Sequence, residues 1–219
     1  MKIFVVIPAY NEARWIAKVV EEVLHAGYKT VVVDDCSKDE TAALAEKVGA
    51  VVLRHIINRG QGAALRTGTN WSIENGAEIV VHFDADGQFR VEDIARVVKP
   101  LVEGKADVVF GSRFLDNTTK LPWAKKNLIM PIARAVNRIF FRVKMTDPQS
   151  GFRAFTAIVG EKLNWRQDRA AHASEILSLV VHERWRVVEV PITVIYHEFG
   201  QSFLGGFKLL VDIFIKKLS

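Results

Sequence analysis

Cysteine is nearly absent from this sequence, since Cys36 is the only one among 219 residues. A disulfide within the chain and a Cys-x-x-Cys metal site are therefore both excluded. Long apolar runs are missing too. No stretch reaches the roughly 18 uninterrupted apolar residues of a membrane-spanning helix, and the strand-like run at residues 2–7 is too short for a secretory signal. These absences predict a cytoplasmic protein that is soluble or peripheral to a membrane.

Internal repeats, low-complexity tracts and linkers rich in proline or glycine are also absent. The composition is that of a globular protein, with 49% hydrophobic and 25% charged residues, which argues against disorder. At this length one sizeable domain is the simplest expectation. We expect the domain to cover residues 1–200. Residues 201–219 are expected to form a C-terminal amphipathic helix, either part of the same domain or docked at a membrane interface.

The formal net charge of +5 indicates anionic partners. Phosphates, nucleotides, nucleic acid and an acidic lipid surface all fit this charge. We do not expect nucleic acid, because the cations are not concentrated in a recognised binding module.

Short apolar, β-branched runs alternate with helical patterns over the first two-thirds of the chain. This alternation predicts an α/β fold with a mostly parallel sheet flanked by helices. The expected strands are residues 2–7, 30–34, 50–53, 79–83 and 107–110, and the expected helices are 12–26, 39–48, 61–75 and 91–104.

A polar cluster follows each expected strand. In a parallel sheet, ligands bind beyond the carboxyl ends of the strands, so the clusters predict one shared cleft. They are residues 8–12, 34–37, 58–62, 84–88 and 111–113.

Asp84 and Asp86 are the sharpest signal in the sequence. Two alternate carboxylates where a strand ends can converge on a hard cation, Mg²⁺ or Mn²⁺. Such a cation would bridge a diphosphate and neutralise charge on a leaving group. Gln88 could add a carbonyl oxygen. The alternative is a loop whose aspartate caps the following helix.

Two further clusters leave two explanations open. Asp34 and Asp35 suit hydrogen bonds to ribose hydroxyls or a base edge, but the residues after them resemble a capping box. Residues 58–64 could present free backbone N–H groups to an anion near Gly62. Tight loop–helix packing explains those glycines equally well. Leu65 breaks the Rossmann fingerprint, and the chain contains no P-loop.

Taken in order, six motifs resemble those of family 2 glycosyltransferases, and within that family those of dolichyl-phosphate mannose synthase and related polyprenyl-phosphate sugar synthases. The resemblance implies the GT-A fold of nucleotide-diphospho-sugar transferases and a GDP- or UDP-linked sugar donor. It also implies inversion at the anomeric carbon, a polyprenyl phosphate lipid as acceptor, and Mg²⁺ or Mn²⁺ as cofactor. The motifs are Pro-Ala-Tyr-Asn-Glu (8–12), Val-Asp-Asp-x-Ser (33–37), Asn-x-Gly-x-Gly-Ala-Ala (58–64), Asp-Ala-Asp-x-Gln (84–88), Gly-Ser-Arg (111–113) and Asp-Pro-Gln-Ser-Gly-Phe-Arg (147–153).

The same resemblance implies roles for individual residues. Those for the nucleotide sugar are Pro8, Tyr10, Glu12, Asp35, Gly62 and Asp84, and those for the metal are Asp84, Asp86 and Gln88. Those for the acceptor phosphate are Arg113, Lys126, Arg134 and Arg153. Arg153 could instead be a structural charge partner. An arginine and a serine that the synthases place in the helical region after Gly-Ser-Arg correspond here to Ile129 and Ala133, so Lys125, Lys126 or Arg134 could substitute.

Three residues are expected to act in the transfer itself: Asp86, Arg113 and Glu175. A sugar hydroxyl needs a general base as it attacks, whereas a lipid phosphate is already anionic near pH 7. Glu175 is a candidate base or acceptor-site carboxylate, or else an ordinary helix-face residue. The Gln-x-x-Arg-Trp motif of processive members lacks its glutamine before Arg184, which favours the phosphate acceptor.

Two segments have the pattern of amphipathic helices, at residues 124–144 and 203–219. Both combine an apolar face with cations, which predicts docking on an anionic membrane surface at its cytoplasmic face. Packing against the protein's own sheet is the alternative.

Three other functions remain open at this point. A sugar-phosphate nucleotidyltransferase would need a glycine-rich basic loop after the first strand, and residues 8–12 contain neither glycine nor a cation. A transferase with a sugar-hydroxyl acceptor and a non-catalytic nucleotide-sugar binder are the other two.

Overall fold

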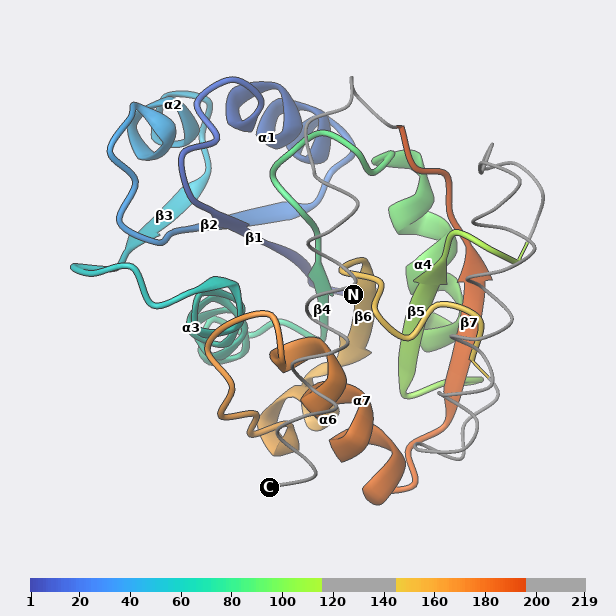
Figure 1. Ribbon diagram of the computed structural model, residues 1–219. Helices are drawn as coiled ribbons and strands as arrows, with labels where there is room; N and C mark the ends of the chain where they lie inside the picture. The colour runs from blue at the N-terminus through green and yellow to red at the C-terminus, as the bar shows by residue number, and fades with distance from the viewer. Residues whose placement is uncertain (116–144, 196–219) are drawn as a thin grey trace, which may run out of the picture.

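The computed structural model describes residues 1–115 and 145–195, which form one seven-stranded sheet with helices on both faces (Figure 1). The strands are β1 (Ile3–Ala9), β2 (Lys29–Asp34), β3 (Val51–Arg54), β4 (Ile79–His82), β5 (Val108–Ser112), β6 (Arg153–Thr156) and β7 (Val187–Pro191). The helices are α1 (Ile16–His25), α2 (Thr41–Lys47), α3 (Gln61–Glu74), α4 (Glu92–Val102), α6 (Ala157–Lys162) and α7 (His172–His182).

The sheet is mixed, with the strand order β3-β2-β1-β4-β6-β5-β7. Strand β1 pairs in parallel with β2 and β4, β2 with β3, and β5 with β7. Strand β6 pairs antiparallel with both β4 and β5. Six strands therefore run in one direction and β6 in the other, which confirms the mostly parallel α/β sheet. Strands β1 to β5 end at the same edge.

Alternate side chains of each strand fill two separate cores. On β1, Val5 and Ile7 face the core that the sheet shares with α1, α2 and α4. Phe4 and Val6 face the core shared with α3, α6 and α7, and Figure 1 shows these two groups of helices on opposite faces of the sheet. Because a strand buried on both faces reads as a continuous apolar run, the central strands were identifiable in the sequence.

The two strands that sequence patterns missed are short and contain a charged residue. Strand β6 has four residues and begins with Arg153, and β7 contains Glu189 and ends in a proline. Neither has the apolar run that identifies β1 or β4. The first helix begins at Ile16 and not at residue 12, because residues 12–15 form a turn in which the amide of Trp15 donates to the carbonyl of Glu12 at 3.0 Å.

The expected amphipathic segments at residues 124–144 and 203–219 lie outside the described residues, as does the boundary expected between residues 200 and 201. None of the helices within residues 1–115 and 145–195 has the length and apolar character needed to cross a membrane.

Helix α3 approaches the sheet closely because a glycine faces it. A Cβ at Gly68 would overlap Val6 and lie 2.9 Å from Cγ2 of Val33. Gly68→Ala should therefore destabilise the fold by about 1–3 kcal/mol through overpacking, although alanine is the better helix former by about 1 kcal/mol. Urea unfolding measures the change. Asn70→Ala, at an exposed position of the same helix, should be neutral or stabilising, and a stabilised Gly68→Ala protein would contradict the close approach.

Candidate active site

Three carboxylates approach one another where β1 and β4 end. Asp84 and Asp86 follow β4, and Glu12 follows β1, which lies beside β4 in the sheet. Burial and the charges of Asp86 and Asp39 raise the pKa of Glu12. Like charges held this close make the site attractive to a cation.

Asp84 is the most strongly perturbed of these acids. Burial, followed by repulsion from Asp86, raises the pKa of Asp84 to about 6. The positive charges of Arg153 and Arg113 oppose this rise, as does a hydrogen bond of 2.9 Å from Nε2 of Gln61 to Oδ1 of Asp84. Asp84 is therefore repelled by the carboxylate of Asp86 and attracted by two guanidinium groups.

The predicted metal ligands suit an ion whose coordination shell is completed by substrate phosphates, and not one coordinated by the protein alone. Within the described ranges, no group of three or more histidine, cysteine, aspartate or glutamate side chains is arranged to hold a metal. Mg²⁺ usually needs only one or two carboxylates when substrate phosphates complete its shell, and Asp84 and Asp86 supply two. The backbone amide of Gln88 donates to Oδ1 of Asp86 at 3.0 Å and so orients that carboxylate. Their role as ligands stays a prediction.

The other predicted nucleoside residues line the same edge. Pro8 is buried within β1 opposite Val33, and Tyr10 is 44% exposed just beyond the strand. The Tyr10 side chain is thus accessible to a ligand. Pro8 is buried and forms part of the end of β1.

Asp35 holds the loop between β3 and α3. Its buried carboxylate accepts hydrogen bonds from the amides of Arg59 at 2.9 Å and Gly60 at 2.6 Å, and lies 2.7 Å from Nδ1 of His55. Burial alone would raise the pKa of Asp35, but these hydrogen bonds outweigh it and lower the pKa. Asp35 anchors this loop, and its contact with a nucleoside stays a prediction.

The glycines that open α3 pack against a later segment of the chain. A Cβ at Gly62 would overlap the carbonyl oxygen of Gln167, and the Gly62 carbonyl accepts a hydrogen bond of 2.9 Å from the indole of Trp165. The amide of Ala63 donates to the carbonyl of Asp168 at 3.1 Å. Packing therefore accounts for Gly62, and its contact with a nucleotide sugar stays a prediction.

Arg113 is fixed by a buried acid that sequence reasoning gave no role of its own. Nε and Nη2 of Arg113 donate to the two carboxylate oxygens of Asp147 at 2.6 and 2.7 Å. Glu189 of β7 accepts hydrogen bonds from the amides of Thr146 and Asp147. The Arg113 side chain keeps 29% of its surface exposed, and its role toward a phosphate stays a prediction. Nothing in the pattern of β7 pointed to Glu189.

Arg153 does not lie on the surface of a phosphate pocket, contrary to the prediction for the acceptor site. It is 1% exposed, and its guanidinium carbon lies 5.9 Å from the ring centre of Phe110. Burial lowers the pKa of Arg153 to about 10, and the charge of Asp84 opposes this shift. The alternative of a structural charge partner agrees with this position, because the strand that carries Arg153 is enclosed between β4 and β5.

Glu175 is occupied by backbone amides. Its Oε2 accepts hydrogen bonds from the amides of Arg166 at 3.0 Å and Gln167 at 2.7 Å. Glu175 thus stabilises the loop that packs on α3, and its role as a general base or acceptor-site carboxylate stays a prediction. Lys126 and Arg134, also predicted for the acceptor phosphate, lie outside the described residues.

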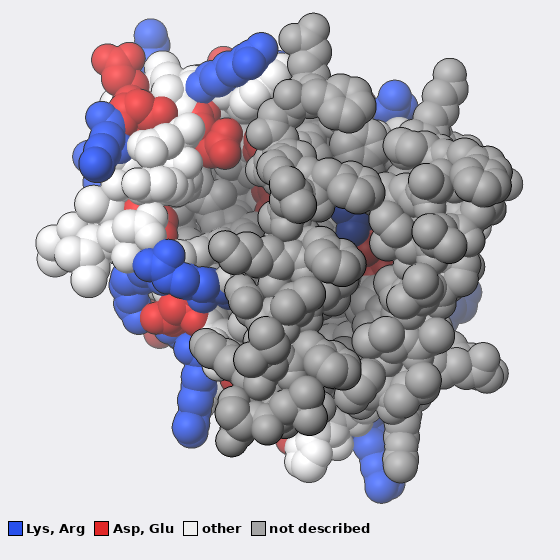
Figure 2. Space-filling view, in the orientation of Figure 1, with Lys and Arg blue, Asp and Glu red and all other residues white. Residues whose placement is uncertain are grey.

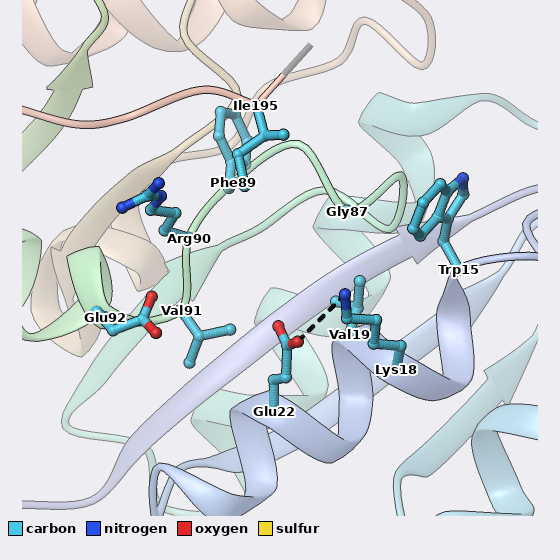
Figure 3. A pocket seen from close by; sticks show the side chains of 10 residues that line it. All are labelled: Trp15, Lys18, Val19, Glu22, Gly87, Phe89, Arg90, Val91, Glu92 and Ile195. Carbon is cyan, nitrogen blue, oxygen red and sulfur yellow. Dashed lines mark ion pairs between the residues drawn. The ribbon is translucent and has the colours of Figure 1, made fainter. Parts of the chain in front are cut away.

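A cavity of about 270 Å³ lies beside the Asp84–Asp86 loop, between it and α1 (Figure 3). Lys18 and Glu22 form an ion pair of 3.8 Å at its wall. None of the predicted site residues lines this cavity. Its lining is Trp15, Lys18, Val19, Glu22, Gly87, Phe89, Arg90, Val91, Glu92 and Ile195.

Charge is mixed on the described part of the face in Figure 2, where acidic and basic side chains alternate.

Comparison with known proteins agrees with these motifs. The model of the family described as Glycosyl transferase family 2 matches residues 4–162. UDP-N-acetylglucosamine–dolichyl-phosphate N-acetylglucosaminyltransferase of Methanococcus voltae is 32% identical over 250 residues, covering 99% of this chain and 96% of that protein. Polyprenol monophosphomannose synthase of Mycolicibacterium smegmatis is 32% identical over 218 residues, covering 92% of this chain and 80% of that protein.

A solved structure shows the same fold. Glucosyl-3-phosphoglycerate synthase from Mycobacterium tuberculosis, in complex with Mn²⁺, uridine diphosphate and glucosyl-3-phosphoglycerate, superposes with a TM-score of 0.71 at 20% identity. The match covers 93% of this chain and 75% of that one. The predicted GT-A fold is thereby confirmed. With its ordered motifs on one edge of that fold and a family match over most of its length, the chain belongs to glycosyl transferase family 2.

Proposed function

We propose that this glycosyltransferase moves a sugar from a GDP- or UDP-linked donor to a polyprenyl phosphate of the dolichyl type, with inversion at the anomeric carbon and with Mg²⁺ or Mn²⁺. The observation that carries the proposal is the arrangement around Asp84. Asp84 and Asp86 are suited to a cation that would bind a diphosphate, and Asp84 feels the charge of Arg113, which the buried Asp147 holds in place. One edge of the sheet thus carries two acidic side chains, Asp84 and Asp86, and the cationic side chain of Arg113.

The acidic residues suit the metal-bound donor, and Arg113 suits the acceptor phosphate. When bound, the cation would neutralise the charge that develops on the departing nucleoside diphosphate, and Asp84 and Asp86 are the residues that would hold it. Arg113 would orient the acceptor phosphate, since the fork of a guanidinium matches phosphate oxygens. The relatives named as a dolichyl-phosphate N-acetylglucosaminyltransferase and as a polyprenol monophosphomannose synthase support this assignment.

The transfer needs no proton acceptor from the protein. An ionised phosphate oxygen attacks the anomeric carbon, the new carbon–oxygen bond forms, and the bond to the diphosphate breaks on the opposite face with its electron pair leaving on the diphosphate. The occupied carboxylate of Glu175 is consistent with such a reaction. A sugar-hydroxyl acceptor would require a free base.

The acceptor also bears on where the enzyme works. A polyprenyl chain resides in a lipid bilayer, so we propose a peripheral enzyme at the cytoplasmic face of a membrane. The segments at residues 124–144 and 203–219 are the candidates for contact with anionic lipid.

Product formation tests the acceptor. Dolichyl phosphate in detergent, incubated with Mn²⁺ and a panel of GDP- and UDP-linked sugars, should yield a lipid-linked sugar detectable by mass spectrometry. Free sugars offered as acceptors should give no product. Transfer to a sugar hydroxyl with none to the lipid phosphate would refute the proposed acceptor.

Nucleotide binding tests the metal. Calorimetry should show that GDP or UDP binds at least about tenfold more tightly with Mn²⁺ than with EDTA, a difference of about 1.4 kcal/mol. Asp86→Asn should remove this gain because one ligand loses its charge, while circular dichroism shows an intact fold. Glu92→Gln, an exposed acid near the same loop, should keep the gain. Equal binding with Mn²⁺ and EDTA would contradict a metal role.

Arg113→Lys tests the acceptor cation, because it keeps the charge and loses the fork. We expect kcat/KM for the lipid phosphate to fall about 100-fold while nucleotide affinity stays within twofold. The matched control is Arg186→Lys, since Arg186 forms a similar fork with Asp107 at the opposite edge of the sheet. Equal losses of activity in the two variants would indicate a general structural effect and remove Arg113 from the proposal.

A further inference from the structure

Strand β6 runs past the loop that carries Asp84. The antiparallel register of β4 and β6 pairs His82 with Arg153. Continuing that register by two residues along each chain places Gly151 opposite Asp84. Gly151, two residues before the start of β6, therefore lies next to Asp84. Under the proposed function, the carboxylate of Asp84 would hold the cation.

Gly151 leaves the space that the Asp84 carboxylate occupies. A Cβ at position 151 would lie 2.6 Å from Oδ2 of Asp84 and 3.2 Å from its Cγ. Gly151 is not among the described glycines with a positive φ, so its backbone conformation does not explain the residue. Any side chain there would have to displace the carboxylate, and the lack of a side chain at 151 is a condition of the geometry of Asp84.

Arg153 supplies a charge behind the same carboxylate. Among the described residues, its Nε and Nη1 atoms are buried without a hydrogen-bond partner. A buried guanidinium is costly unless an opposite charge compensates it. Asp84 is the acid whose charge stabilises Arg153, while Gln61 donates to Oδ1 of Asp84 from α3 at 2.9 Å. The carboxylate thus receives a hydrogen bond from α3 and is attracted by a charge on β6.

We propose that strand β6 is a template for Asp84, in which Gly151 and Arg153 are positioning residues that set where the carboxylate points. Gly151 does this by leaving room and Arg153 by attraction. The inference rests on the proposed function for the role of Asp84 toward a cation. It goes beyond that function because it assigns a role in positioning Asp84 to β6, the antiparallel strand between β4 and β5.

A double-substitution cycle on stability tests the role of Gly151 without any metal. Gly151→Ala should lower the urea midpoint of the full chain, because its methyl group overlaps the Asp84 carboxylate. In the Asp84→Ala background the overlap is gone, so the same substitution should cost less than about a third as much. Equal costs in both backgrounds would overturn the template. If Gly151→Ala alone does not fold, the double variant should regain a cooperative transition, and failure to regain it would also overturn the template.

Mn²⁺ binding in the presence of UDP or, separately, GDP tests the consequence for the site. Gly151→Ala should weaken Mn²⁺ at least about tenfold. The matched control is Gly160→Ala in α6, whose Cβ would lie 2.7 Å from Cδ1 of Ile73, in the core beneath α3. It should lower stability and leave Mn²⁺ affinity within twofold. Unchanged affinity in Gly151→Ala, or equal losses in both variants, would refute the inference. Absence of Mn²⁺ binding by the unmodified chain would instead refute the proposed metal role, and the stability cycle would still decide the template.

The charge of Arg153 is tested by a second cycle. The losses of stability in Arg153→Met and Asp84→Asn should be strongly non-additive, because each substitution removes half of one interaction. Arg153→Lys should retain more of the Mn²⁺-dependent nucleotide binding than Arg153→Met, since it keeps a cation. Additive losses, or equal binding in the lysine and methionine variants, would remove Arg153 from the template.

Discussion

Repulsion between carboxylates at the edge of the sheet is the constraint around which the site is built. Glu12, Asp84 and Asp86 come together in partly buried positions, where their charges repel. Such an arrangement is unfavourable for the isolated protein and is stable only because other groups compensate. Arg113 and Arg153 provide that compensation from within the fold. The remaining imbalance is what a divalent cation and a diphosphate would relieve, so the strain of the free protein and its proposed chemistry have the same origin.

A second group of acids has a different task. Asp35, Glu175 and Glu189 each accept hydrogen bonds from backbone amides of neighbouring loops. A carboxylate can satisfy two or more amides at once, and bonds to a charged acceptor are stronger than neutral ones. These residues therefore fix the loops on which Arg113 and the opening of α3 depend. Asp35, Glu175 and Glu189 thus stabilise loops, whereas Glu12, Asp84 and Asp86 face the candidate site.

The sequence was sufficient for the main sheet and for the position of the cleft. Strands β1 to β5 are apolar runs of the expected length, and the direction of a βαβ unit places their carboxyl ends together. The pair Asp84 and Asp86 and the arginine of Gly-Ser-Arg were predicted at this edge for that reason. Strand β6 was missed because four residues beginning with a buried arginine carry no strand signal. The same strand explains why Arg153, which a linear motif places in the acceptor pocket, is buried within the sheet beside His82.

What the sequence determined by itself is the set of chemical groups and the edge at which they gather, because hydrophobic periodicity and strand direction are local properties of the chain. Which groups remain available to a ligand was decided only by the tertiary structure. Gly62, Glu175 and Arg153 look alike as motif residues, yet the first packs on a distant loop, the second binds backbone amides, and the third is enclosed between strands. Hydrogen-bond partners and burial come from segments remote in the chain, so no local pattern records them.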